Sequence, residues 1–164
     1  MSTTDDIAKV AEQERLCVFK GFDETTALTI GTRIGELAKA AGKALAIDIR
    51  LWNRQLYFYA MPGTTPDNLE WIRRKSNFVR RYNRSSYSQT LRFEAAGKTG
   101  FAFDDGVDDM EIAAHGGSFP IRIAGVSVIG AITVSGVPGR HDHGFVVQAI
   151  CEHLGIDYAP LALD

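Results

Sequence analysis

The sequence predicts an α+β fold in which a central antiparallel sheet of about five strands is flanked by helices. Hairpin patterns are mixed with amphipathic helical patterns without strict β-α alternation, which favours an antiparallel sheet with helices packed on it. The 164 residues are 45% hydrophobic and 23% charged, as is typical of a globular domain. No repeat and no long linker rich in Pro, Gly or Ser divides the chain. We therefore expect a single domain over residues 1–164.

The N-terminal part of the chain is expected to form two helices before the sheet begins. Apolar residues recur at helical spacing over 5–16, and residues 17–19 resemble a short strand. Asp23 is expected to cap a second helix, which ends at Gly42. Residues 45–51 then alternate between apolar and polar side chains, which predicts a strand with one buried face.

The rest of the chain supplies the other expected strands and helices. The aromatic-rich returning strand covers 55–61, and a loop over 62–68 caps a third helix that runs to about Tyr82. The remaining expected elements are a fourth helix over 85–96, a Gly- and Asp-rich connection over 98–109, a hairpin of 119–123 and 126–134 around Ala124-Gly125, and a last helix over 141–154.

Composition excludes several classes of protein. Eighteen basic and twenty acidic residues give a net charge of -2, so no overall field would recruit nucleic acid or an acidic membrane. The N-terminus has no secretory signal pattern, and no apolar run is long enough to span a bilayer. The two cysteines, Cys17 and Cys151, lack metal-ligand spacing. We expect a cytoplasmic protein with reduced thiols, although a disulfide between the two stays open.

The segment 113–120 places a histidine and two glycines beside the expected buried hairpin. Glycine lets a backbone approach a ligand or another chain closely because it has no Cβ, and loops on a rigid scaffold often carry sites. His115, Gly116 and Gly117 are therefore candidate ligand-binding residues, together with Ser118, which follows them. The alternative is that the two glycines make a plain turn and His115 is a solvated loop residue.

Lys75 stands out on the third expected helix. On a helical wheel it falls inside the apolar arc, so its ammonium must either reach water along its aliphatic stem or meet a buried anion. The opposite arc is basic and is expected to be solvated or to face another subunit. The apolar arc holds Leu69, Trp71, Ile72, Phe78, Val79 and Tyr82, and the basic arc holds Arg73, Arg74, Arg80, Arg81 and Arg84.

Asp48 and Arg50 are two residues apart on an expected strand, so their side chains share one face. Neither charge can lie in an apolar core without a partner. One interpretation is that they pair with each other or with neighbours. The other is that Asp48, Arg50 and Lys75 converge beneath the His115 loop and form a polar pocket.

The other histidines do not form a metal site by their spacing. His141 and His143 are two apart, so they do not face each other on a helix. Asp142 between them is expected to cap the last helix, and His153 is expected to pack against the core. Ser118 lacks the Gly-x-Ser-x-Gly elbow of a hydrolase, and no dinucleotide fingerprint occurs. No resident metal is expected.

Taken together, several segments resemble an uncharacterised protein family that is a branch of the haem-degrading-domain, or GlcG/HbpS-like, group. The resemblance covers about residues 10–154 and implies a profilin-like fold and a symmetric homo-oligomer. Some members of the wider group bind haem, and a non-covalent haem would need one axial side chain, which His115 could supply. The segments that carry the resemblance are Ala46–Arg50, Pro62–Asn68 with Trp71, Ile72 and Lys75, His115–Ile121, Thr133–Gly136, and Asp142-His143.

These observations lead to a functional hypothesis. The chain is expected to be a cytoplasmic homo-oligomer that binds a small anionic ligand, with haem or another tetrapyrrole as one candidate, at His115, Gly116, Gly117 and Ser118 with Lys75, Asp48 and Arg50 behind them. No nucleic-acid or membrane partner is expected, and whether the protein is an enzyme stays open. The alternative is a structural or protein-interaction module without turnover, in which the same loop serves oligomer packing.

Overall fold

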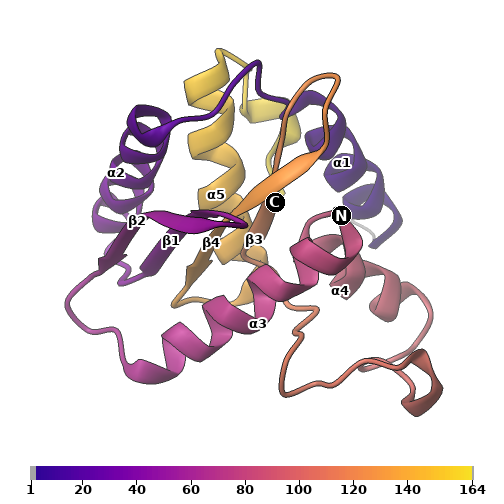
Figure 1. Cartoon of the computed structure of the whole chain (residues 1–164). Helices are drawn as coiled ribbons and strands as arrows, with labels where there is room; N and C mark the ends of the chain where they lie inside the picture. The colour runs from indigo at the N-terminus through magenta and orange to yellow at the C-terminus, as the bar shows by residue number, and fades with distance from the viewer. Residues whose placement is uncertain (1–2, 164) are drawn as a thin grey trace.

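The computed structural model describes residues 3–163 and contains a four-stranded antiparallel sheet with the strand order β2-β1-β4-β3. In Figure 1 the sheet lies in the middle of the molecule, with helices on both sides. β1 and β4, which are far apart in the sequence, form the centre of the sheet. The strands are β1 Ala46–Leu51, β2 Arg54–Ala60, β3 Ser118–Arg122 and β4 Val128–Ser135.

The expectation of about five strands is wrong by one. Residues 17–19 do not form a strand, because only Phe19 pairs, through a single parallel bridge with Ile123. The Phe19 N–H donates to the carbonyl of Arg122 at 2.8 Å, and the Ala124 N–H donates to the carbonyl of Phe19 at 2.9 Å. The next helix begins at Glu24, so the chain leaves the sheet edge after one pair.

The five predicted helices are confirmed, with ends within about two residues of those expected, as is usual for helix ends. The Asp23 carboxylate accepts the Thr26 N–H at 2.8 Å, as expected of an N-cap. The Ser85 side chain likewise caps the fourth helix. The helices are α1 Thr3–Leu16, α2 Glu24–Ala40, α3 Pro66–Tyr82, α4 Ser86–Ala95 and α5 Gly139–Leu154, with short 3₁₀ turns at Phe103–Asp105 and Ala159–Leu161.

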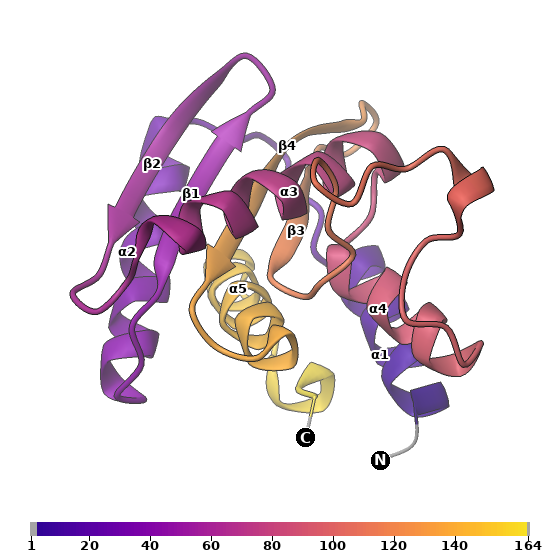
Figure 2. The same cartoon turned by 90° about the horizontal axis from the view of Figure 1, so that it is seen from below.

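The two faces of the sheet differ in chemistry. Helices α2 and α5 cover one face, α3 crosses the other, and α1 and α4 lie together beside β3 (Figures 1 and 2). The α2/α5 face is apolar and forms the main core. Its sheet residues are Ile47, Ile49, Phe119, Ile121, Ile132 and Val134.

The α3 face carries polar side chains in its interior. Asp48 and Ser118 both pair with Thr133 on the central strand β4, and all three side chains are fully buried. A buried polar side chain needs a hydrogen-bond partner, so the α3 face is where chemistry-bearing residues are held in place.

No helix within residues 3–163 is long and apolar enough to cross a membrane.

Candidate functional site

A hollow of about 270 Å³ lies where the start of α3, the end of β4, the start of α5 and the 115–116 loop meet. We call it the His115 hollow. It brings together three of the predicted site residues, Lys75, His115 and Gly116. Its lining consists of Asp67, Asn68, Trp71, Lys75, His115, Gly116, Ser135, Gly136, Val137, Gly139 and Asp142.

Lys75 is held by a buried partner and does not extend to water. It is 2% exposed, and its Nζ donates to the carbonyl of Gly116 at 3.0 Å, to the carbonyl of Val134 at 2.6 Å and to Oδ2 of Asp142 at 3.0 Å. An ammonium group has three N–H donors. All three are therefore used inside the protein, and the buried anion is Asp142.

Asp142 does not cap the last helix, and that expectation is wrong. α5 begins at Gly139, so Asp142 is its fourth residue and is 2% exposed. Its Oδ1 accepts the Val137 N–H at 3.1 Å while its Oδ2 binds Lys75. Burial raises the pKa of Asp142 and lowers that of Lys75, and the attraction within the pair opposes both shifts. The carboxylate thus ties the start of α5 to α3.

The two glycines allow the loop to pack against this ion pair. Gly117 has a φ of +121°, and a Cβ at this position would lie 2.5 Å from Nζ of Lys75. A Cβ on Gly116 would lie 2.1 Å from the carbonyl oxygen of Gly139. No larger residue fits at either position without a shift of the backbone or of the lysine. The Gly-Gly sequence is therefore required for close packing as well as for the turn.

His115 lies at the surface, at the rim of the hollow. Its ring contacts the Trp71 ring edge to face, with centroids 5.1 Å apart, and the Arg74 guanidinium lies 4.7 Å above the same indole. Partial burial, followed by the positive charges of Lys75 and Arg74, lowers the pKa of His115. These effects favour the neutral imidazole, the form that accepts a proton or a metal ion.

His115 also lines a second, larger hollow of about 420 Å³ between α4 and residues 98–114. Phe93, Phe101 and Ile112 supply apolar surface there, and Arg74 supplies a positive charge. The imidazole thus stands between a polar hollow and a more apolar one.

The structure does not bring Asp48 and Arg50 to the His115 hollow. Ser135, which lines the hollow, pairs with Ala46, whereas Asp48 and Arg50 lie further along β1. Arg50 donates from Nε to Oδ2 of Asp48 at 2.6 Å and from Nη2 to Oδ1 at 2.8 Å. Arg50 lines a different hollow, with Ser76 and other residues. The interpretation that the two residues pair with each other is the one that the structure supports.

Ser118 is buried beneath α3 and α4 and does not line the His115 hollow. Its Oγ lies 2.8 Å from Oγ1 of Thr133, and its N–H donates to Oγ of Ser86 at 3.1 Å. These contacts fix the start of β3, directly after the two glycines.

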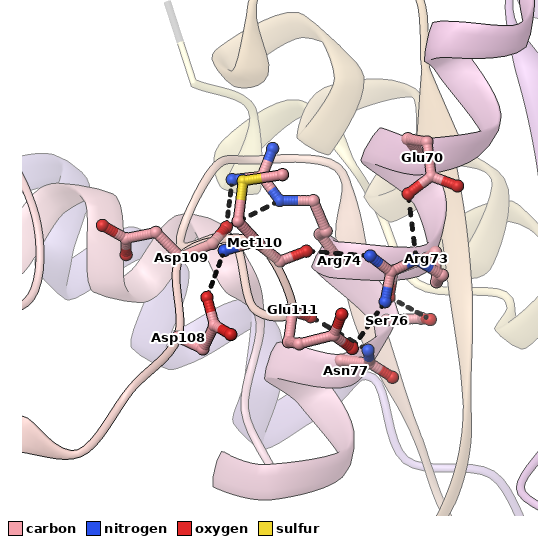
Figure 3. A network of polar contacts seen from close by, with 9 residues as sticks. All are labelled: Glu70, Arg73, Arg74, Ser76, Asn77, Asp108, Asp109, Met110 and Glu111. Carbon is pink, nitrogen blue, oxygen red and sulfur yellow. Dashed lines mark hydrogen bonds and ion pairs between the residues drawn. The ribbon is translucent and has the colours of Figure 1, made fainter.

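Three of the five arginines on the basic arc of α3 hold the segment that leads to His115. Figure 3 shows Arg73, Arg74 and Asn77 reaching residues 109–111. Three arginines of the basic arc are therefore bonded within the chain. Arg80 and Arg81 are exposed, as expected of a solvated face, and a contact of this face with another subunit stays a prediction. The contacts are Arg73 to Glu111 Oε2 at 2.7 Å and Met110 O at 2.8 Å, Arg74 to Asp109 O at 2.8 Å, Asn77 to Glu111 O at 2.9 Å, and Arg81 to Gly106 O at 3.0 Å.

The fully buried histidine of α5 is His143, whereas the expected packing of His153 against the core is confirmed only for one contact, with Phe19. His143 is fully buried, with Nε2 at 2.7 Å from Oε1 of Gln13, and burial lowers its pKa to about 3. His153 is exposed, but its ring contacts that of the buried Phe19, with centroids 6.2 Å apart. Within residues 3–163, no group of three or more His, Cys, Asp or Glu residues is arranged to hold a metal ion.

Cys17 and Cys151 meet in the core as free thiols, with their sulfur atoms 3.8 Å apart. The sequence did not predict this contact, because the two cysteines are far apart along the chain. The contact between Lys75 and Asp142 was not predicted for the same reason.

Comparisons with known proteins agree with this architecture. Residues 22–151 match the family model described as haem degrading protein HbpS-like. A UPF0303 protein of Burkholderia vietnamiensis is 48% identical over 164 residues, which cover 100% of this chain and 99% of that protein. The crystal structure of the Ybr137w protein aligns with a TM-score of 0.80 at 26% identity, covering 91% of this chain and 87% of that one. The structure of a PduOC:Heme complex aligns at 0.67 and 14% identity, covering 80% and 94%, and shows similarity of fold alone.

Proposed function

Because this chain belongs to the family described as haem degrading protein HbpS-like, we propose that it is a cytoplasmic homo-oligomer that binds a small anionic ligand beside His115. Haem or another tetrapyrrole is the first candidate. The observation that carries the proposal is the position of His115, a surface imidazole with a lowered pKa between two hollows.

The residues around His115 fit a non-covalently held haem in their donor chemistry. A neutral imidazole is a common axial ligand of haem iron, and Phe93, Phe101 and Ile112 offer apolar surface to a flat ring. When bound, haem would supply an iron atom, and His115 would be the residue that holds it. The PduOC:Heme complex, a structure of the same fold, supports the same candidate.

The anionic group of the ligand would accept hydrogen bonds from backbone N–H groups and not from the Lys75 ammonium. All three donors of Lys75 are used within the chain, so its contribution is its charge and the position it gives to the loop. Gly139 begins α5 at the edge of the His115 hollow, and Pro138 before it offers no capping side chain. The positive end of a helix favours carboxylate groups.

Haemin titration of the purified full chain tests the proposal. We expect a Soret band that saturates at one haemin per chain and an affinity at least about tenfold weaker in His115→Ala. His141→Ala is the matched control, because His141 is also exposed but lines neither hollow, and its affinity should equal that of the wild type. Haemin dimethyl ester, which lacks free carboxylates, should bind more weakly. Equal haemin affinity in wild type and His115→Ala would show that His115 does not bind haem.

The alternative, a structural or interaction module, has one observation in its favour. The polar groups of Lys75 and Asp142 are paired internally, while the edge strand β2 leaves Phe58 42% and Tyr59 44% exposed. An edge strand presents unpaired backbone groups that can pair with another chain. Light scattering of wild type and Phe58→Glu tests this. A smaller particle in the variant, without any haemin signal in the wild type, would favour the alternative.

A further inference from the structure

A third hollow, separate from His115, lies where the end of α3, α4 and residues 98–105 meet. Its volume is about 340 Å³, at the lower end of the range for small-molecule sites. We call it the cationic hollow, because three positive side chains line it: Arg84, Arg92 and Lys98.

The positive charges of the cationic hollow are not neutralised by neighbouring carboxylates. Within residues 3–163 none of the three forms an ion pair. Asp105 is the one acidic residue in the lining, and its carboxylate accepts the N–H of Ala102 at 2.7 Å. Glu14 of α1 also acts on Arg84 through its charge. One carboxylate in the lining leaves an excess of positive charge.

Arg84 has an unused donor in this region. Its Nη2 donates to the side-chain oxygen of Gln89, whereas its Nε is buried and has no hydrogen-bond partner within residues 3–163. Burial, and then the charge of Arg92, lowers the pKa of Arg84. Two guanidinium groups that repel each other, one with a buried free donor, are stabilised by an anion between them.

Aromatic side chains form the other wall. Tyr82 and Phe101 lie nearly parallel, with ring centroids 6.0 Å apart and planes inclined by 10°. Phe93 meets Phe101 edge to face at 5.1 Å. A planar ring of a ligand packs favourably against such groups. The volume suits a single ring system with one charged group.

We propose that the cationic hollow binds a small molecule that carries a phosphate group on a planar aromatic ring system, of the size of a mononucleotide. Arg84, Arg92 and Lys98 bind the phosphate, because guanidinium groups match its oxygens in pairs, and Tyr82, Phe93 and Phe101 contact the ring. This site shares no residue with the His115 hollow. Phe93, Lys98 and Phe101 also line the second hollow beside His115, so a haem bound there would compete with the phosphorylated ligand for these side chains.

Isothermal titration calorimetry with three separate probes tests the proposal on the full chain: adenosine 5′-monophosphate, adenosine and inorganic phosphate. We expect the monophosphate to bind at one per chain and at least about tenfold more tightly than either part alone. The variant Arg92→Gln/Lys98→Gln should weaken monophosphate binding at least about tenfold. Both side chains are exposed, so this variant is expected to fold. Lys39→Gln/Lys43→Gln removes the same charge from exposed positions outside the hollow and should change the affinity less than about twofold.

The variant Phe101→Leu distinguishes the contribution of the aromatic ring to the binding affinity from that of the phosphate. It should reduce the advantage of the monophosphate over inorganic phosphate while leaving the affinity for phosphate unchanged. The proposal is overturned if the monophosphate does not bind at millimolar concentration, if it binds no more tightly than adenosine, or if both double variants weaken it equally, since a general charge effect would then explain the binding.

Discussion

Replacing Lys75 by methionine should destabilise the protein more than any exposed charge substitution. Lys75 and Asp142 are each 2% exposed and their charged atoms lie 3.0 Å apart. Methionine fills a similar volume but leaves the Asp142 carboxylate buried without its cation. Breaking a buried ion pair in this way costs about 3–5 kcal/mol of unfolding free energy. That is a large part of the roughly 5–15 kcal/mol by which a domain is typically stable.

A double-mutant cycle separates the ion pair from the packing of the two side chains. Asp142→Asn keeps an oxygen for the Val137 N–H but leaves the Lys75 ammonium without a counter-charge. Lys75→Met/Asp142→Asn contains no buried charge. We therefore expect the double variant to lose less than the sum of the two single losses, by about 2 kcal/mol.

Guanidinium chloride unfolding at pH 7, followed by circular dichroism and tryptophan fluorescence, measures these free energies. Lys39→Met, at an exposed position on α2, is the control and should change stability by less than about 0.5 kcal/mol. A loss below about 1 kcal/mol in Lys75→Met, the value typical of an exposed pair, would refute the argument that this pair is desolvated. Strict additivity in the cycle would refute the direct pairing.

Three further predictions concern His143, Gly117 and Arg73. The pKa of His143 is lowered from 6.5 to about 3, so the unfolded chain takes up a proton first. Stability should therefore fall below pH 6.5, by up to about 1.4 kcal/mol per pH unit, and His143→Gln should show a weaker loss between pH 7 and pH 5 in urea unfolding. Gly117→Ala should cost at least about 2 kcal/mol, because its φ of +121° and the nearby Lys75 both oppose a Cβ. Arg73→Met should speed amide hydrogen exchange in residues 106–111, which Arg73 helps to hold.

Control variants at comparable positions test the predictions for Gly117 and Arg73. Gly125 also has a positive φ but nothing near its Cβ position, so Gly125→Ala should cost only the backbone strain, roughly 1 kcal/mol. Arg80→Met, at an exposed position on α3, should leave exchange in 106–111 unchanged. Equal losses of stability in the two glycine variants would contradict the role of the Lys75 contact. Equal amide exchange rates in the two arginine variants would contradict the role of Arg73. A pH dependence of stability in His143→Gln equal to that of the wild type would contradict the role of His143.

Local patterns in the sequence were sufficient for most of the secondary structure. The cap at Asp23 and the turn at Gly125 depend on neighbouring residues only, so a single sequence contains the needed information. The prediction of a fifth strand was wrong because strand pairing is not a local property. Residues 17–19 have strand-like side chains, but the number of pairs they form depends on the distant edge residue Ile123.

The candidate site was predicted in part, because its loop is local and its ion pair is not. The apolar arc left two outcomes for Lys75, an ammonium that reaches water along its aliphatic stem or one that meets a buried anion, and the sequence did not identify the anion. Asp142 is 67 residues away, and only the meeting of α3 with the start of α5 selects it. The expectation that Asp48 reaches the hollow is wrong, because the β1–β4 register places Ala46, not Asp48, opposite Ser135.

The Lys75–Asp142 ion pair and the His115 imidazole should contribute differently to fold stability and to ligand binding at the His115 hollow. Nζ of Lys75 holds the carbonyl of Gly116, the residue next to His115, so Lys75 is a positioning residue for the imidazole. His115 itself lies at the surface and has an aromatic contact with Trp71. His115→Ala should therefore weaken haemin binding while the free energy of unfolding stays within about 0.5 kcal/mol of the wild type. Lys75→Met should lower both. If His115→Ala destabilises the fold as much as Lys75→Met does, the imidazole is part of the packing of the loop, and the oligomer-packing alternative gains the support that the ligand site loses.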